Sequence, residues 1–222
     1  MTVLLVILTF AAFILLDALV KRRREAREPA AREVAPALVA PEPVWVAGYQ
    51  LPETLYYHRG HTWVRVFDAD TVAVGMDDFA RRLLGPARTV TLPALGTWLE
   101  QGERGLGVQV DGRAADLIAP VTGEVVEVNE TLREHPTLAS DDPYGRGWIL
   151  KVRPSRLAAS LRNLLSGRLA RRWTEEARES LDLRLMALSG SVLQDGGESV
   201  ADFARHLSNE DWRRLVAELL LT

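Results

Sequence analysis

The sequence predicts a mainly β domain, a small barrel or sandwich, with an N-terminal transmembrane helix before it and a C-terminal α-helical extension after it. Between residues 51 and 154, short runs of alternating apolar residues are separated by Gly and Pro turns, as in small all-β domains. The first 20 residues are almost entirely apolar, and beyond residue 155 the apolar residues recur at helical spacing. We therefore divide the 222 residues into four segments: 1–20, 21–50, 51–154 and 155–222.

Residues 1–20 form the predicted membrane-spanning segment. The 19 residues from Thr2 to Val20 contain one charge, Asp17, and as a helix they extend about 28 Å, close to the thickness of a bilayer's hydrocarbon core. Basic residues follow this run at 21–24 and none precedes it, the reverse of a cleaved signal peptide. The positive-inside bias therefore predicts a single-pass protein of the inner (cytoplasmic) membrane with the bulk of the chain in the cytoplasm. A buried soluble helix is the alternative, but a segment that is apolar all round would need a groove that a small domain hardly offers.

Residues 21–50 read as a linker that is first basic and then rich in Pro and Ala, and its four prolines keep it extended. The sequence leaves open whether Trp45 and Tyr49 pack on the domain or lie at the membrane surface. Residues 21–33 carry a local charge of +3, whereas residues 34–222 sum to −5 within a total of −3. An acidic body gives no electrostatic reason to expect nucleic acid as a partner.

The β domain at 51–154 is predicted from period-two alternation bounded by turn residues. The predicted strands lie at 62–67, 71–75, 89–92, 105–110, 116–119, 124–128 and 148–152. Residues 77–84 are predicted as a helix because Phe79, Leu83 and Leu84 are spaced to bury one face. A polar segment outside the predicted strands begins at Thr131. It ends in turn residues at 141–145, which lead into the last strand.

The central feature of this domain is a hairpin. Val108 and Val110 alternate with polar residues, Asp111-Gly112 is a strong signal for a two-residue turn, and residues 115–119 begin the return strand. We expect Asp111-Gly112 at an exposed tip that is the working end of the domain.

A series of short motifs extends from Tyr57 to Ser155. In order, these motifs are His61-x-Trp63-Val64, Val74-Gly75-x-x-Asp78-Phe79-Ala80, Leu84-Gly85, Leu92-Pro93-x-x-Gly96, Gly102-Glu103, Asp116-Leu117-x-x-Pro120-Val121-x-Gly123-Glu124-Val125 and Asp142-Pro143-Tyr144-Gly145-x-Gly147-Trp148. As a collinear set they make this region resemble the H protein of the glycine cleavage system, a carrier that moves an aminomethyl group on a lipoyl arm between partner enzymes. The resemblance implies the barrel-sandwich hybrid fold shared by lipoyl and biotinyl domains.

The resemblance also implies where the arm would be attached. Placing the motif at 116–121 on the family pattern puts the lipoyl-lysine position at Gly112, flanked by Asp111 and Arg113 where the family usually has small or apolar residues. Glycine has no amine to form the amide bond. The positively charged guanidinium of Arg113 is no substitute nucleophile.

The rest of the chain supplies neither an attachment point nor a reactive centre. Its two lysines are Lys21, beside the apolar segment, and Lys151, which alternation places on the solvent face of a strand. The histidines are too scattered for a metal site, and they stand at His58, His61, His135 and His206. The absence of cysteine excludes thiolate chemistry, and no nucleophile beside a base and no phosphate-binding glycine loop is found. We therefore predict a non-enzyme with no cofactor and no metal.

Residues 155–222 are predicted to be helices that pack on themselves. One apolar stripe covers residues 157–165, and Ser166-Gly167 separates it from a longer stripe formed by Leu169, Trp173, Ala177, Leu181, Leu185 and Leu188. Two capping boxes, Ser199-x-x-Asp202 and Ser208-x-x-Asp211, predict two short closing helices. Mixed charges on the polar face argue against the alternative of a membrane-surface helix.

Three functions fit these features. The first is a membrane-anchored, non-lipoylated H-protein-like domain that acts as a non-catalytic binding or scaffolding module for an unknown cytoplasmic protein partner, and it accounts for both the anchor and the missing lysine. The alternative is an authentic lipoyl carrier of glycine cleavage, which Gly112 argues against. An export-system adaptor with a lipoyl-like domain is less favoured, because such adaptors typically insert a coiled coil where this chain has a tight Asp-Gly turn.

Overall fold

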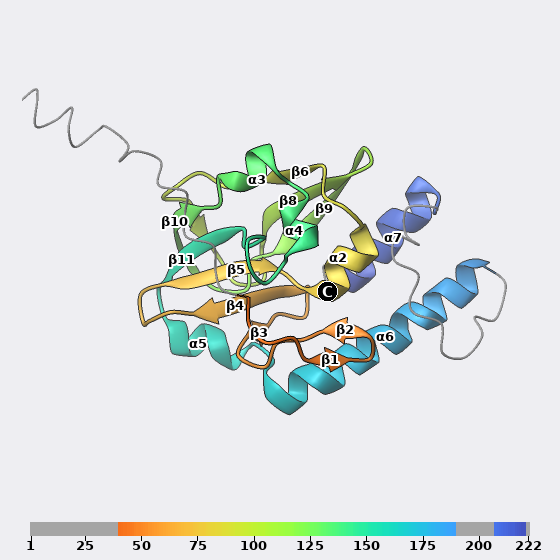
Figure 1. The fold of residues 1–222 in the computed structure, drawn as a ribbon, viewed down its shortest axis with the longest axis horizontal. Helices are drawn as coiled ribbons and strands as arrows, with labels where there is room; N and C mark the ends of the chain where they lie inside the picture. The colour runs from red at the N-terminus through yellow and green to blue at the C-terminus, as the bar shows by residue number, and fades with distance from the viewer. Residues whose placement is uncertain (1–39, 190–206, 221–222) are drawn as a thin grey trace, which may run out of the picture. The chain divides into compact units, whose positions relative to one another are not determined.

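The computed structural model describes residues 40–189 and 207–220 (Figure 1). All described residues belong to one compact unit. The predicted transmembrane helix at 1–20, most of the linker, His206 and the capping box at Ser199 lie outside the described residues. In the part of the chain that is described, no helix has both the length and the apolar character needed to cross a membrane.

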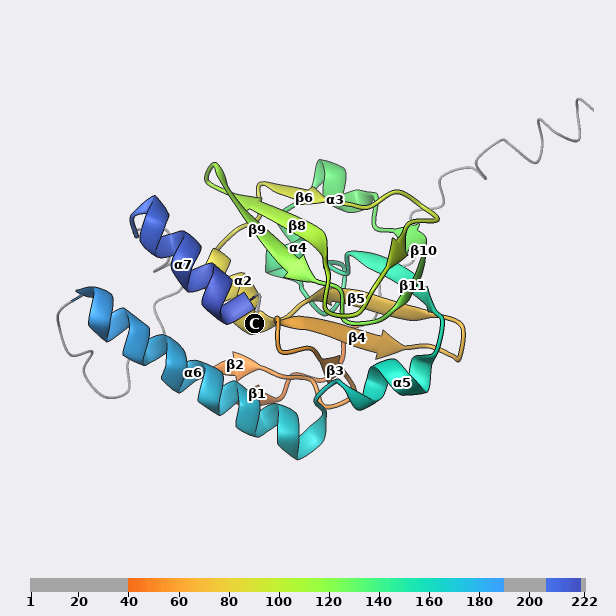
Figure 2. The same ribbon diagram turned by 180° about the vertical axis from the view of Figure 1, so that it is seen from behind.

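Two antiparallel sheets form the β domain (Figures 1 and 2). The larger sheet has six strands in the order β3 (Tyr56–Tyr57), β4 (Thr62–Val66), β5 (Val72–Met76), β11 (Leu150–Pro154), β10 (Gly123–Val128) and β7 (Trp98–Leu99). The smaller sheet has three strands in the order β6 (Thr89–Thr91), β8 (Arg104–Val110) and β9 (Arg113–Ile118). Since β8 lies in the middle of the smaller sheet, β9 is an outer strand of it.

Six described helices accompany the sheets. They are α2 (Asp78–Leu84), α3 (Thr131–Glu134), α4 (Leu138–Asp141), α5 (Leu157–Arg162), α6 (Gly167–Ser189) and α7 (Asn209–Leu220). The Asp77 side chain caps α2 by accepting a hydrogen bond from the Ala80 N–H at 2.8 Å, and the helix ends at Gly85, whose φ of 88° suits glycine. The predicted helix at 77–84 is therefore confirmed, with Asp77 as its cap.

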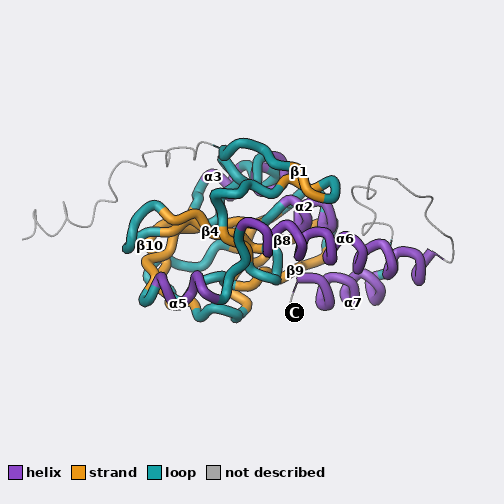
Figure 3. The backbone as a smooth tube through the Cα atoms, turned by 90° about the horizontal axis from the view of Figure 1, so that it is seen from below, coloured by secondary structure: helices purple, strands orange, loops and turns teal. Residues whose placement is uncertain are grey.

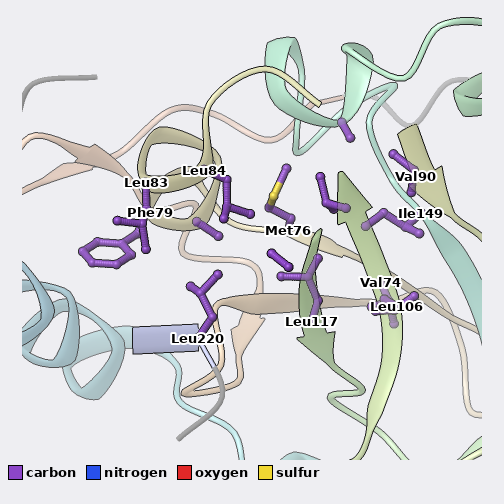
Figure 4. Close-up of a cluster of buried hydrophobic side chains, with 14 of the residues drawn as sticks. Val74, Met76, Phe79, Leu83, Leu84, Val90, Leu106, Leu117, Ile149 and Leu220 are labelled. Atoms are coloured by element: carbon purple, nitrogen blue, oxygen red, sulfur yellow. The ribbon is translucent and has the colours of Figure 1, made fainter. Parts of the chain in front are cut away.

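The core lies between the two sheets and extends to the helices. Figure 4 shows side chains from β5, β8, β9 and α2 converging on one apolar cluster, which Leu220 of α7 also joins. Val74, Met76 and Leu117 are fully buried in it. The alternation that predicted half-buried strands therefore corresponds to inward-facing core residues.

The C-terminal helices do not form a cap of their own but pack on the β domain. Buried positions on α6 recur every three or four residues at Ala170, Thr174, Ala177, Leu181 and Leu185. Leu169, predicted to belong to this stripe, is 67% exposed. At this end of α6 the buried face passes through Ala170 and Thr174 instead. The capping box at Ser208 is confirmed in its main contact, since the Asp211 N–H donates to Ser208 Oγ at 3.1 Å where α7 begins.

The last part of the predicted linker belongs to the folded unit. Trp45–Val46 (β1) and Tyr49–Gln50 (β2) pair through a turn at Ala47 and Gly48. Tyr49 is buried 5.1 Å from the Phe79 ring, and the Gln50 N–H donates to the fully buried Asp78 carboxylate at 2.8 Å. Trp45 stays 59% exposed, so these two aromatic residues have different environments.

Several short elements were not predicted. Strands β3 and β7 have two residues each, and the predicted polar segment that begins at Thr131 contains α3 and α4 with four residues each. Such elements are too short for a hydrophobic period to repeat within them. Their burial comes from tertiary contacts, as at Leu132 and Ala139, which are 1% and 0% exposed.

Candidate functional site

The hairpin of β8 and β9 has the tip that the sequence predicts. Val110 pairs with Arg113, and the two residues between them have φ values of 48° at Asp111 and 78° at Gly112. Two positive φ angles in a two-residue loop define a type I′ turn, which Asp-Gly favours and which matches the twist of the flanking strands. Strand β9 begins at residue 113 rather than at the predicted 116, because the turn takes only these two residues.

The tip is open at the residue that the resemblance matches to the lipoyl-lysine. Asp111 and Gly112 are both exposed, and a Cβ added at Gly112 would meet no other atom within 4 Å. A side chain at this position would therefore extend into open space. The position has the exposure that a carrier arm requires, whereas the residue itself has no group to hold one.

The residues on either side of Gly112 are held by ionic and polar contacts. Asp111 faces the guanidinium of Arg88 at 3.5 Å, and Arg113 donates to Asn209 Oδ1 at 2.9 Å and to the Leu207 carbonyl at 2.8 Å. The Arg113 guanidinium also lies 5.6 Å from the centre of the Trp212 ring. The tip is therefore tied on one side to the loop before β6 and on the other to the start of α7.

Lys151 does not lie on this hairpin but on the larger sheet, in strand β11 between β5 and β10. Its ammonium is 2.7 Å from Glu127 Oε2 and 5.0 Å from the centre of the Trp148 ring. With 14% of the side chain exposed, the lysine is more enclosed than the solvated strand lysine that the sequence predicts. An amine held in an ion pair and covered by an aromatic ring is a poor attachment point.

The base of the hairpin is fastened to the first motif of the family series. The Thr62 hydroxyl donates to the Ile118 carbonyl at 2.9 Å, which links β4 to the end of β9. Beside it, His61 is buried, with Nδ1 2.8 Å from Asp77 Oδ2. Its ring stacks on Phe79 at 4.1 Å and lies 4.5 Å from the Trp173 ring of α6. His61 is thus a packed structural histidine that joins β4, α2 and α6.

The three described histidines do not form a common site. His58 lies at the turn before β4, where its Nδ1 accepts the Gly60 N–H at 3.0 Å, and His135 is exposed at the end of α3. Within residues 40–189 and 207–220, no group of three or more His, Asp or Glu side chains is arranged to hold a metal ion.

The fold and the hairpin together define a mainly β domain of the lipoyl type, and the comparisons with known proteins agree. Residues 55–177 match the family model described as the glycine cleavage H-protein. This chain therefore belongs to the glycine cleavage H-protein family. The match covers the whole β domain from β3 onward together with α5 and the first half of α6.

Individual relatives match about half of this chain. The probable glycine cleavage system H protein of Thermococcus gammatolerans is 39% identical over 120 residues, which are 54% of this chain and 89% of that protein. The glycine cleavage system H protein of Bacteroides fragilis is 42% identical over 114 residues, 51% of this chain and 89% of its own. The crystal structure of a glycine cleavage system H protein from Mycobacterium marinum superposes with a TM-score of 0.51 at 30% identity, covering 57% of this chain and 98% of that one.

The contact between Arg113 and α7 was not predicted. The sequence carries a signal for the helix, since Trp212, Leu215, Val216 and Leu219 follow the Ser208 cap at helical spacing. It carries none for the surface on which that apolar face packs. Only the structure brings residues 207–212 to the residue that follows the hairpin tip.

Proposed function

We propose that this chain is a non-lipoylated member of the H-protein family that works as a binding or scaffolding module rather than as a carrier. The observation that supports the proposal best is the tip of the hairpin. Its backbone and exposure suit a carrier position, yet the residue there is Gly112, and both neighbours are charged and engaged in contacts. A surface that keeps its geometry without an attachment group is suited to contact a partner directly.

The proposal includes a membrane anchor at residues 1–20 and a cytoplasmic location for the rest of the chain. Its support is the uncharged run up to Asp17 followed by four basic residues at 21–24. An anchor would hold the module beside a membrane-bound or membrane-recruited protein partner, and the acidic body disfavours nucleic acid in that role.

The alternative is an authentic lipoyl carrier of glycine cleavage, and family membership supports it no better than it supports the binding module. That alternative needs an amine, and among the described residues only Lys151 offers one. Modification there would require the ion pair with Glu127 to break and the side chain to leave the Trp148 ring. The environment of Lys151 therefore supports the non-carrier proposal.

Intact-mass measurement of the native protein tests this proposal. We expect no lipoyl-sized increase in mass, whereas a lipoyl group mapped to Lys151 would restore the carrier alternative. Gly112→Lys extends the test, because the φ of 78° costs lysine only about 1 kcal/mol and the space around the position is open. In cells that lipoylate H proteins we expect modification of the triple variant that combines Gly112→Lys with Asp111→Val and Arg113→Ala, because these changes also replace the charged neighbours by the small or apolar residues that are usual in the family. The matched control is Gln109→Lys, an exposed lysine on the same hairpin away from its tip, which should remain unmodified.

The binding role has a separate test. If the module binds through its surface, the proteins cross-linked to it in native membranes should be the same in cells that can make lipoyl groups and in cells that cannot. A lipoyl-dependent carrier would lose those partners when lipoylation is abolished. Loss of the cross-linked proteins in the deficient cells would therefore reject the binding module.

A further inference from the structure

Helix α7 lies beyond the part of the chain that matches the family. The family match ends at residue 177, whereas α7 extends from Asn209 to Leu220. Figures 1 and 2 both show this helix running alongside β9, the outer strand of the smaller sheet, and Figure 3 shows it next to α6. The added helix is thus packed on the hairpin that carries the candidate site.

The helix follows β9 from one end of the strand to the other. Asn209 at the start of α7 accepts a hydrogen bond from Arg113 at the start of β9. At the far end, Leu220 and Ile118 both border Gly60, where an added Cβ would lie 2.6 Å from the Leu220 carbonyl oxygen and 2.9 Å from Ile118 Cγ1. Twelve helical residues extend about 18 Å and six strand residues about 20 Å, so the two elements match in length.

The contact is apolar along its length and polar at the tip. Trp212, Leu215, Val216 and Leu219 are 2–7% exposed, and they belong to the same core cluster as Val110 and Ala115 of the hairpin. At the tip, the guanidinium of Arg113 makes two hydrogen bonds to residues 207 and 209 and covers the Trp212 ring. A helix on an outer strand also protects that strand from pairing with other chains.

From this arrangement we infer that α7 clamps the β8–β9 hairpin in cis, with Arg113 and Trp212 as the positioning residues at the tip. The clamp closes the apolar face of the hairpin and sets the position of Asp111 and Gly112 relative to the body. The tip is then a rigid surface whose shape depends on a segment outside the family fold. A partner that binds the tip would contact both the hairpin and the start of α7. This inference does not depend on whether the tip is lipoylated.

Hydrogen exchange on the full chain tests the clamp. Arg113→Ala removes both tip hydrogen bonds while leaving the apolar contacts of α7 in place. We expect amide exchange to become about tenfold faster at residues 108–117 and in α7, with exchange in β4 and β5 unchanged. Arg104→Ala is the matched control, because Arg104 lies on the same hairpin and pairs only with the exposed Asp116 at 3.7 Å. It should leave exchange at 108–117 within about twofold of the unaltered chain.

Trp212→Ala provides the second variant and removes the ring on which Arg113 lies. It should accelerate the same two segments, again without β4 and β5. Faster exchange in α7 with an unchanged hairpin, in either variant, would overturn the inference, because the hairpin would then be rigid without the helix. No change in either segment would overturn it as well. Equal acceleration in β4 and β5 would also do so, since α7 would then belong to the global folding unit instead of acting as a local clamp.

Discussion

At the scale of single residues, the family motifs of this chain act as packing constraints around Trp63. The indole is fully buried, and its Nε1–H donates to the carbonyls of Met76 and Pro143 at 2.9 and 3.1 Å. Gly75, on the neighbouring strand and paired with Trp63, lies directly against the ring. The first, second and last motifs of the series therefore meet at one tryptophan.

Gly75→Ala should destabilise the fold by about 2 kcal/mol, because overpacking of a filled core is costly. The new Cβ would lie 2.5 Å from Trp63 Cζ2, and the two indole hydrogen bonds prevent the ring from moving away. Gly105→Ala is the control and should cost less than about 1 kcal/mol, since its Cβ would lie close only to the flexible end of Leu99, at 2.8 Å, and would be in ordinary contact with Ala119 Cβ at 3.7 Å. Urea unfolding of both variants measures the difference. Similar losses in the two would refute this explanation of Gly75.

A second residue-scale prediction concerns His58 and acid. Burial, and then the electrostatic effect of His61, lower the pKa of His58 below its ordinary value of 6.5. The bond from the Gly60 N–H to Nδ1 also requires the neutral ring. Because the unfolded chain binds this proton more readily than the folded chain, stability should be full above about pH 6.5 and fall as the pH decreases toward the lowered pKa.

Replacing His58 by Gln should therefore flatten the dependence of the unfolding free energy on pH between about 7 and 5. Urea unfolding at several pH values in that range measures it. The exposed His135→Gln serves as the control and should follow the unaltered chain. Parallel profiles for the His58 variant and the unaltered chain would show that this histidine does not contribute.

At the scale of elements, α6 is bound to the β domain through a narrow face. Arg178 donates to the Ala47 carbonyl at 3.1 Å, and Arg171 pairs with Glu53, so polar contacts flank the buried stripe. Leu181 is 5% exposed within the core cluster, whereas Leu183, two positions along the same helix, is 68% exposed. The two leucines allow the contribution of packing to be separated from helix propensity.

Leu181→Ala should lower the free energy of unfolding by about 2–4 kcal/mol through lost burial and the remaining cavity. Leu183→Ala should change it by less than about 0.5 kcal/mol. Urea denaturation of the full chain measures both values. If the two substitutions cost the same, α6 is not part of the core on which the hairpin rests.

At the scale of the whole molecule, the proposed anchor determines which compartment the hairpin reaches. The chain has no cysteine, so single cysteines can be introduced for labelling. Glu42→Cys lies just before β1 and Glu103→Cys just before β8, and both positions are exposed. In intact cells we expect neither to react with a membrane-impermeant maleimide, and both to react after lysis, because residues 21–222 are proposed to be cytoplasmic. Labelling of either cysteine in intact cells would contradict the orientation and favour the export-adaptor alternative.

The local features of the candidate site could be predicted from the sequence. Asp111-Gly112 specifies a two-residue turn through the backbone angles that these residues tolerate, and the structure confirms that turn. Asp77 and Ser208 likewise mark helix starts, because a cap depends on residues only three positions apart. The order of the motifs was enough to indicate the family, which the comparisons confirm.

What the sequence could not determine depends on contacts between distant residues. Trp45 and Tyr49 share a linker composition, yet only Tyr49 is buried, because Phe79 and α2 provide a surface for it. The alternation of apolar residues places Lys151 on a solvent-facing side, but Glu127 of the neighbouring strand β10 pairs with it, and the distant Phe67 ring lies 5.8 Å from its ammonium.

By itself, then, the sequence determined the turn at the hairpin tip, the family of the β domain and the absence of a lysine at residue 112. The tertiary structure alone decided that α7 lies along β9 and that Arg113 is held by residues 207 and 209. The physical reason is the range of the interactions. Turns and caps are set by dihedral preferences and hydrogen bonds within a few residues, whereas the docking of an apolar helix depends on an uncovered surface that exists only after distant strands have paired.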